Sequence, residues 1–441
     1  MRKIKFSLII LFANFYLQAQ NIKVYFNQSV DNSVSPITDA QTSANLDDTI
    51  CSLIDSAIIS LDIAVWDNGS SKIVTALNNA YNRGVQVRYI SSTNSSNSAL
   101  SGLNSNIPIL KRNATLSSHV MHNKFIIIDN QKLLTGSMNF GTGSMFDDYN
   151  NIVIITDTGL AQNYTIEFNE MWGSTGSLPN TSNSKFGPDK TDNTTHNFTV
   201  SGTNIESYFS PTDNTTSKIV NAINTADYTL DIAMFTFINN DIGDAVIAAK
   251  NRGVNVRCII ENINYFGSEY NSLVSNGINV LSHSNLPNDL HHKYCIIDAA
   301  KADSDPIVVT GSHNWTNSAE DDYDENTLII HDSIVANQYW EEFSKRFAES
   351  GALGVSDITN VSNHKFFPNP FSTTTTLQTY NFLNNATLTV YNVCGQEIKQ
   401  IKNISGKTII LQRDNLPIGQ YFIRLTEGNK LSEVFKLVIT D

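Results

Sequence analysis

The chain contains the same polar motif twice, and this duplication constrains its fold more than any other feature of its 441 residues. Each copy has the spacing H-x-K-x4-D, and the second copy begins 169 positions after the first. Because a motif that recurs over this distance indicates two copies of one structural unit, we expect two similar halves. The six motif residues are His122, Lys124 and Asp129 in the first copy and His291, Lys293 and Asp298 in the second.

A short GSxN element follows each copy and belongs to the same repeat. The glycines that open it are 175 positions apart, so six more residues lie in the second loop, between Ala300 and Pro306. The element adds hydrogen-bonding side chains to the histidines and lysines of each half. These side chains are Ser137 and Asn139 in the first half and Ser312 and Asn314 in the second.

Four further segment pairs recur in the same order and predict the fold class. They are IKVYF and IESYF, LDIAVW and LDIAMF, NRGVQVR and NRGVNVR, and NNIVIIT and ENTLIIH. Strand, helix and strand alternate, which indicates α/β halves with a mostly parallel or mixed sheet and flanking helices. We expect the halves 21–172 and 204–350 to pack about a pseudo-two-fold axis, joined by a polar linker at 173–203.

The two ends of the chain differ from this repeat. Residues 1–20 begin with basic residues and continue with an apolar run that is shorter than the ~20 residues of a membrane span. This pattern predicts a cleaved secretory signal. Residues 360–441 alternate between apolar and polar positions, with turn residues between the runs, and predict a small C-terminal β-sandwich.

The four cysteines are dispersed without a CxxC pair, so they predict no zinc site. A disulfide is compatible with export, but buried free thiols are the favoured interpretation. The four are Cys51, Cys258, Cys295 and Cys394.

The strand KFIIID places His122 and Lys124 on one side, because residues two apart on a strand share a face. His291 and Lys293 have the same relation. Neither pair fills a site alone, so we expect both pairs to meet across the pseudo-two-fold axis in one joint site.

The duplicated H-x-K-x4-D and GSxN pattern resembles the two HKD motifs of the phospholipase D superfamily, from about Asn21 to Glu349. The last 80 or so residues resemble the type A sorting domain of the type IX secretion system, which implies that secretion machinery as a partner. It also implies a protein that is secreted or held at the cell surface. The stretches that carry this second resemblance are Pro368-Asn369-Pro370-Phe371, VYNVCGQ, Gly419-Gln420-Tyr421 and Lys436-Leu437-Val438.

The resemblance to phospholipase D implies hydrolysis of a phosphodiester through a phosphohistidine, with no metal and no cofactor. It favours His122 as the nucleophile and His291 as the general acid, with Lys124 and Lys293 stabilising the phosphoryl oxygens. Both aspartates belong to the catalytic motif, but their position after the strand favours a role in ordering the following loop. The remaining donors would bind the phosphate, and they are Ser137, Asn139, Ser312 and Asn314.

The resemblance also implies a glutamate that braces a catalytic histidine, and Glu325 fits that position. The matching position in the first half is Asn150, with Asp148 as an alternative two residues earlier. If Glu325 raised the basicity of His291, the roles of the two histidines would be reversed. Of the neighbouring residues, His292 is expected to point away from the site, His313 to line its rim, and Phe140 and Trp315 to wall a pocket or to pack in the core.

Three functions fit these observations. The first is a secreted enzyme that converts a phosphatidylcholine-type lipid to phosphatidic acid, with no obligate protein partner. The second is a metal-independent endonuclease or a cardiolipin hydrolase-like enzyme on the same scaffold, and the third is an inactive phosphate-binding protein. A net charge of −13 favours lipid over nucleic acid. A lipid enzyme would expose apolar residues near the site, and the loops 92–118 and 262–290 are the expected places.

Overall fold

The computed structural model describes residues 21–35, 38–113, 119–301, 303–356, 364–392, 397–426 and 433–441. They form two compact units, Met1–Ala348 and Glu349–Asp441. The expected signal at 1–20 and the thiol of Cys394 lie outside the described residues. Within the described ranges, no helix has the length and apolarity that a membrane span requires.

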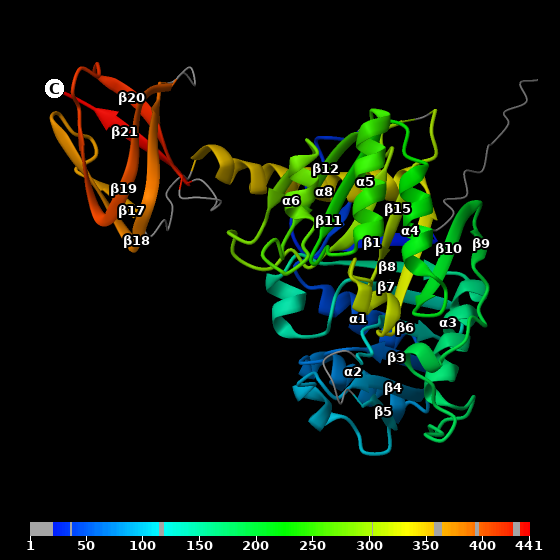
Figure 1. Ribbon diagram of the computed structural model, residues 1–441. Coiled ribbons are helices and arrows are strands. Elements are labelled where there is room, and N and C mark those ends of the chain that lie inside the picture. The colour runs from blue at the N-terminus through cyan, green and yellow to red at the C-terminus, as the bar shows by residue number, and fades with distance from the viewer. Residues whose placement is uncertain are drawn as a thin grey trace, which may run out of the picture. The chain divides into compact units, whose positions relative to one another are not determined.

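In its described residues, the first half of the larger unit is an eight-stranded sheet with three α-helices (Figure 1). The helices are α1 (Leu46–Asp55), α2 (Ser71–Asn82) and α3 (Thr158–Trp172). In sheet order, the strands are β2 (Gln41–Thr42), β1 (Ile22–Phe26), β8 (Asn151–Thr156), β7 (Lys132–Gly136), β6 (Lys124–Ile128), β3 (Ser60–Val65), β4 (Gln86–Ser92) and β5 (Ile109–Arg112).

The second half repeats this arrangement with a second eight-stranded sheet. Its helices are α4 (Thr215–Asn224), α5 (Asn240–Arg252), α6 (Tyr270–Ser275), α7 (Asn317–Asp321) and α8 (Ser333–Ser356). In sheet order, its strands are β13 (Asn279–Ser282), β12 (Asn255–Ile260), β11 (Thr229–Met234), β14 (Lys293–Ile297), β15 (Ile307–Gly311), β16 (Glu325–His331), β10 (Thr203–Ser210) and β9 (Asn197–Val200).

Both sheets are mixed, which is one of the two forms that the sequence predicts. β3, β4 and β5 run parallel, because α2 and the segment after β4 carry the chain back across the sheet. β3, β6, β7 and β8 pair antiparallel, and β6 and β7 are joined by a short turn that permits no crossover. The predicted α/β fold with two similar halves is confirmed, and the strands that carry the motifs lie in the antiparallel part.

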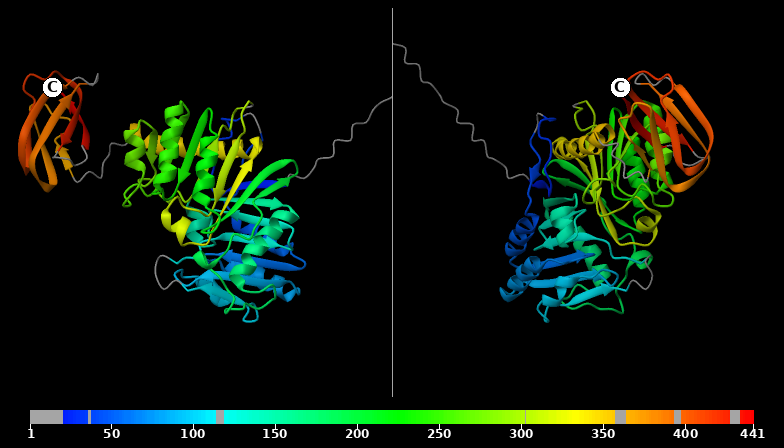
Figure 2. Two further views of the ribbon diagram at one scale, coloured as in Figure 1. Left: turned by 45° about the vertical axis from the view of Figure 1, so that its right-hand side comes forward. Right: turned by 90° about the vertical axis from the view of Figure 1, so that its left-hand side faces the viewer.

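Alternating side chains of the central strands build three core layers. On β6, Phe125 and Ile127 face the second half, whereas Ile126 and Ile128 face α1 and α2. β14 has the same alternation, since Tyr294 and Ile296 belong to the core that the two halves share. The shared core lies between the sheets, and the helix pair α4 and α5 covers the outer face of the second sheet (Figure 2). Lys124 and Lys293, the first residues of β6 and β14, lie on the same strand face as Ile126 and Cys295, which belong to the outer cores.

The segment 173–203, predicted as a linker, packs closely against the larger unit. It contains the short helix η3 (Gly187–Asp189), the fully buried amine of Lys190 and the strand β9. β9 pairs antiparallel with β10, so the second sheet begins before residue 204. The segment therefore contributes core contacts as well as a connection.

The C-terminal unit is one curled, nearly closed sheet of five strands. β18 is long enough to pair with β17 near its start and with β20 near its end. This one strand therefore connects β17 to β20 and β21 in the curled sheet. Phe371, from the predicted sorting motif, is buried and bonds through its backbone with Val438 on the last strand and with Thr440 just after it. The five strands are β17 (His364–Phe367), β18 (Thr374–Tyr391), β19 (Glu397–Gln412), β20 (Gly419–Thr426) and β21 (Glu433–Ile439).

The cysteine prediction is confirmed for the described residues. Cys258 and Cys295 are buried free thiols on β12 and β14, and Cys51 is a partly buried free thiol on α1.

Candidate active site

The two H-x-K pairs lie together at the interface of the halves. Each lysine amine donates to the backbone carbonyl of its own histidine, at 2.5 Å for Lys124 and 2.6 Å for Lys293. All four side chains are largely buried, and each half adds positive charge close enough to lower the pKa of the other half's histidine. The arrangement concentrates two imidazoles and two amines in one small volume.

A carboxylate from the second half holds the histidine of the first half. Glu325 Oε1 lies 2.7 Å from Nδ1 of His122, and its side chain is fully buried at the start of β16. This position corrects the alternative in which Glu325 raises the basicity of His291. The sequence identifies the glutamate, but only the packing of the two halves determines which histidine it contacts.

An amide from the first half holds the histidine of the second half. Asn150 Oδ1 lies 2.9 Å from Nδ1 of His291 and also accepts the hydroxyl proton of Ser137 at 2.7 Å. The amide nitrogen of Asn150 donates to the carbonyl of Ser144 at 2.8 Å, which fixes which end of the amide faces the imidazole. Asp148, the alternative in the sequence, accepts instead from the backbone of Asp289 at 3.2 Å.

We call Glu325 and Asn150 the braces of His122 and His291. The two braces contact Nδ1 in the same way but differ in charge. In both cases the oxygen favours a proton on Nδ1, which leaves Nε2 as the reactive nitrogen. A carboxylate stabilises an imidazolium, whereas a neutral amide does so much less. The braces therefore make His122 the better base and His291 the better acid.

A second pair of asparagines fixes the interface behind the site. Asn326 receives the hydroxyl proton of Thr135 at 2.6 Å, and its amide donates to Asn123 at 2.9 Å. Asn151 occupies the equivalent place in the first half, within 3.0 Å of His292 and 3.3 Å of Thr310. Because these residues directly adjoin the braces, the contacts between the halves and the histidine geometry depend on each other.

The four predicted phosphate-binding residues differ in their contacts: the two serines bond to the backbone of neighbouring strands, whereas, in the part of the chain that the structure describes, the two asparagines keep a free side-chain oxygen. The hydroxyls of Ser137 and Ser312 are buried and accept from the backbone N–H groups of Asn151 and Asn326, at 3.1 and 3.0 Å. Gly136 and Gly311 permit this approach, since a Cβ at either would lie 2.2–2.3 Å from a backbone oxygen of β8 or β16. Asn139 and Asn314 each have a buried side-chain oxygen without a hydrogen-bond partner in the described residues.

The motif aspartates lie at the far end of their strands. Asp129 accepts from the backbone N–H groups of Ile59 and Ser60 at 2.7 and 2.9 Å. Five strand residues at about 3.3 Å each separate it from Lys124 by about 16 Å. Asp298 accepts from Tyr228 and Thr229 in the same way, at 2.9 and 2.7 Å. Both carboxylates order the turn before a central strand and do not reach the histidines.

Replacing Asp129 by alanine is expected to reduce the free energy of unfolding by about 1–3 kcal/mol, because several backbone N–H groups lose their acceptor. The value of kcat should change by less than about threefold, since the carboxylate is one strand length from the site. Chemical denaturation and steady-state kinetics measure the two effects. D55A removes an exposed ion pair and is the control, with an expected cost of about 0–1 kcal/mol. A large loss of kcat in folded D129A would contradict this role.

Two aromatic side chains that the sequence analysis did not identify flank the histidines. The ring of Trp66 lies 5.6 Å from that of His122, and the ring of Phe235 lies 4.8 Å from that of His291. Both are partly exposed and follow the equivalent strands β3 and β11. The aromatic residue that ends LDIAVW and LDIAMF is the sequence signal that identifies them.

Burial determines the protonation of the site. It lowers the pKa of Lys124 to about 7, with Glu325 and Asp67 acting in the opposite direction. It also lowers the pKa of Lys293 and of both histidines, and the neighbouring lysines lower the histidine values further. Burial raises the pKa of Glu325 to about 7, against the effect of Lys124. A bound phosphodiester anion would favour the charged form of both lysines.

The value of kcat/KM is expected to fall with rising pH, because His291, as the general acid, loses the proton that it donates and, above about pH 7, Lys124 loses the charge that binds the phosphate. The activity falls, and does not rise, with pH because burial stabilises the neutral amine of Lys124 and so lowers its pKa from 10.5. Substrate opposes this loss, so the alkaline limb of kcat should lie at higher pH than that of kcat/KM. K124R should remove the part of the kcat/KM limb near pH 7, and an unchanged limb would contradict the assignment to Lys124.

The neighbouring residues mainly support the fold. His292 points away from His291 as predicted and lies 3.0 Å from Glu342 on α8, in the core between the halves. His313, predicted at the rim, is buried, and its Nε2 lies 3.6 Å from Glu320. Phe140 and Trp315 are buried in the outer cores, so core packing is the correct one of the two predicted roles.

Comparison with known families agrees with this geometry. A family model described as "Cardiolipin synthase, PLD-like domain" matches the chain twice, at residues 50–172 and 219–347. The protein belongs to this phospholipase D-like family. A second model, for a secretion system C-terminal sorting domain, matches residues 365–440 and indicates secretion to the cell surface or beyond. Both resemblances drawn from the sequence are confirmed.

Individual relatives share parts of the chain. A mitochondrial cardiolipin hydrolase from Chlamydomonas reinhardtii is 32% identical over 139 residues, which are 31% of this chain and 59% of that protein. A phospholipase D from Rickettsia prowazekii is 30% identical over 156 residues, which are 35% of this chain and 73% of that protein. The chain thus spans less than two thirds of the length of the first of these relatives.

A solved phosphatidylserine synthase from Haemophilus influenzae has the same fold over both halves. It covers 76% of this chain and 87% of its own, with a TM-score of 0.54 and 14% sequence identity. At this identity the likeness supports the fold alone.

Proposed function

We propose that the protein is a secreted phosphodiesterase that hydrolyses phospholipid headgroups through a phosphohistidine. The observation that carries the proposal is the pair of crossed braces, Glu325 on His122 and Asn150 on His291, beside two buried lysines. This arrangement supplies a nucleophile, a proton donor and fixed positive charge, which are the three requirements of the reaction.

The residues divide the reaction into two steps. Nε2 of His122 attacks phosphorus, the bond to the headgroup oxygen breaks, and His291 gives that oxygen its Nε2 proton. Neutral His291 then takes a proton from water, the water oxygen attacks phosphorus, and the bond to His122 breaks. Lys124 and Lys293 stabilise the charge on the phosphoryl oxygens in both steps.

Two features of the surface favour a lipid over a nucleic acid. Phe266 is fully exposed and Tyr265 is 57% exposed on the loop after β12, where Asn262 bonds to the backbone of Phe235 beside the site. Aromatic side chains with this exposure suit the boundary of a bilayer. Asp148 and Asp289 lie near Lys293, and their charge opposes the approach of a polyanion.

Of the two loops expected to expose apolar residues, the described part of the first, residues 92–113, does not carry the patch. Four of its large aliphatic residues are buried, whereas the second loop exposes its aromatic pair. The buried residues are Leu100, Leu103, Ile107 and Leu110.

The test is to incubate the full chain, with a chelator present, with mixed phospholipid vesicles and separately with single- and double-stranded nucleic acid. The double variant H122A/H291A is the blank. Headgroup release that the blank lacks supports the proposal, and phosphatidic acid is the expected product. Strand cleavage with intact lipid would assign the site to nucleic acid instead. Loss of the activity with chelator would overturn the expected independence of metal.

A further inference from the structure

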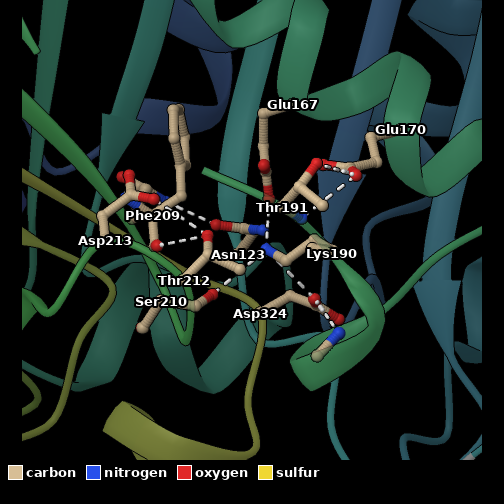
Figure 3. Close-up of polar contacts among 12 residues, drawn as sticks. Asn123, Glu167, Glu170, Lys190, Thr191, Phe209, Ser210, Thr212, Asp213 and Asp324 are labelled. Carbon is tan, nitrogen blue, oxygen red and sulfur yellow. Dashed lines mark hydrogen bonds and ion pairs between the residues drawn. The ribbon is translucent and has the colours of Figure 1, made fainter. Parts of the chain in front are cut away.

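A buried ionic cluster lies directly behind the brace of His122. Lys190, from the segment between the halves, has no exposed side-chain surface and donates to Glu167 on α3. Its amine also donates to the carbonyl of Ser210 at 3.1 Å and lies 3.3 Å from Asp324 Oδ1 (Figure 3). Asp324 immediately precedes Glu325. The cluster therefore joins the connecting segment, the first half and the second half at one point.

Asp324 receives a second cation and a backbone donor. Arg112 Nη1 lies 2.8 Å from its Oδ2, and the N–H of Gly187 lies 2.7 Å from its Oδ1. Position 187 favours glycine, because its φ is +56° and a Cβ there would lie 2.9 Å from the backbone oxygen of Asp322 and 2.3 Å from Arg112 Nη2. Both carboxylate oxygens are thus held by groups that have no role in the proposed reaction. One of these groups, the N–H of Gly187, belongs to the connecting segment.

The backbone of Asp324 forms hydrogen bonds with the segment that contains His122. Its carbonyl accepts the N–H of His122 at 3.0 Å, and its N–H donates to the carbonyl of Val120 at 3.0 Å. These bonds tie the residue before Glu325 to the residues that lead into His122. The separation of Glu325 from His122 depends on this bridge between the halves.

The other half has a buried ion pair of different composition behind His291. By the repeat, Tyr149 occupies the position of Asp324, immediately before Asn150, and its N–H donates to the carbonyl of Asp289. The backbone bridge is thus retained, but the charged groups differ. Behind His291, Arg346 pairs with Glu342 at 3.1 Å and lies 4.4 Å from the ring of Tyr149, whereas behind His122 the residue before the glutamate is itself a carboxylate.

We propose that Lys190 is a positioning residue for the reaction, holding Asp324 so that Glu325 orients the imidazole of His122. The inference rests on the proposed function but concerns a residue that does not contact the substrate. Misplacement of a reacting group by about 1 Å costs up to about 100-fold in rate. Lys190 therefore acts on kcat through His122 and leaves binding of the phosphate by the lysines largely unchanged.

The test compares K190M with K185M in the full chain. Lys185 lies in the same segment and pairs with Glu170 on the same helix, but it is partly exposed and does not contact Asp324. K190M should lower kcat by about tenfold or more with KM changed by less than about threefold, and K185M should leave both unchanged. Folded K190M with a kcat within about threefold of wild type would overturn the proposal.

A second readout does not depend on turnover. The proton on Nδ1 of His122 should give a downfield NMR resonance, identified by its loss in H122A, because a carboxylate accepts it. K190M should shift or broaden this resonance and K185M should not; an unchanged resonance in K190M would reject the inference. If wild type hydrolyses no diester, the proposed function fails while this measurement still tests the positioning.

Should K190M fail to fold, D324N removes the charge with little change of shape. It should reproduce the loss of kcat and the altered resonance. Folded D324N with both properties of wild type would overturn the proposal.

Discussion

Replacement of His122 by alanine is expected to lower kcat/KM by about 10⁴-fold or more, because no other group can form the bond to phosphorus. H291A should cause a comparable loss with a lipid, whose headgroup oxygen is a poor leaving group. With a p-nitrophenyl diester, H291A should retain much more of its kcat/KM than H122A, since nitrophenolate leaves without a proton. Its kcat should still fall, because His291 is also the base for hydrolysis of the phosphohistidine. Steady-state kinetics on the two substrates provides the measurement.

A matched control and an intermediate trap complete this test. H331A removes a partly exposed histidine at the end of β16, which pairs with Glu206 and Asp305 away from the site, and should behave as wild type. Quenched reactions should contain phosphate on His122 in wild type and in H291A. A phosphate found on His291 would reverse the assigned roles, and full activity in H122A would reject the mechanism.

Replacement of Glu325 by glutamine is expected to lower kcat by about 10²–10⁴-fold, although the two side chains have nearly the same shape. Glutamine can turn its amide toward Nδ1 of His122 and favour a proton on Nε2, the nitrogen that must attack. The loss should be equally large with the nitrophenyl diester, because it affects the nucleophile and not the departure of the leaving group. Kinetics on both substrates and the thermal stability of E325Q should be measured together.

The reciprocal change at Asn150 distinguishes the two braces. N150D places a carboxylate on His291 and raises the pKa of its imidazolium, which makes it a weaker acid. The variant should therefore lose activity with lipid and keep it with the nitrophenyl diester, unlike E325Q. If E325Q spared the nitrophenyl substrate and N150D did not, His291 would be the nucleophile.

The features that could be predicted from the sequence alone are those that occur in both halves. Spacing alone predicted two α/β halves, because the motif and its surrounding strands recur at 169 to 183 positions. Alternation along KFIIID and KYCIID correctly placed each histidine and lysine on one face, since the two-residue period of a strand is a local property. The same local reasoning placed His292 on the opposite face, where it contacts Glu342.

The tertiary structure decided the relations between the halves, because these depend on contacts between residues far apart in the chain. Glu325 follows the second motif in sequence, yet it braces His122 across the interface, 203 positions away. Spacing could not predict Lys190 as part of a buried cluster, since its polar surroundings resemble an exposed linker. The proposed assignment of His122 as base and His291 as acid therefore follows from the packing of two similar sheets, whereas the repeat alone predicted that both histidines are present.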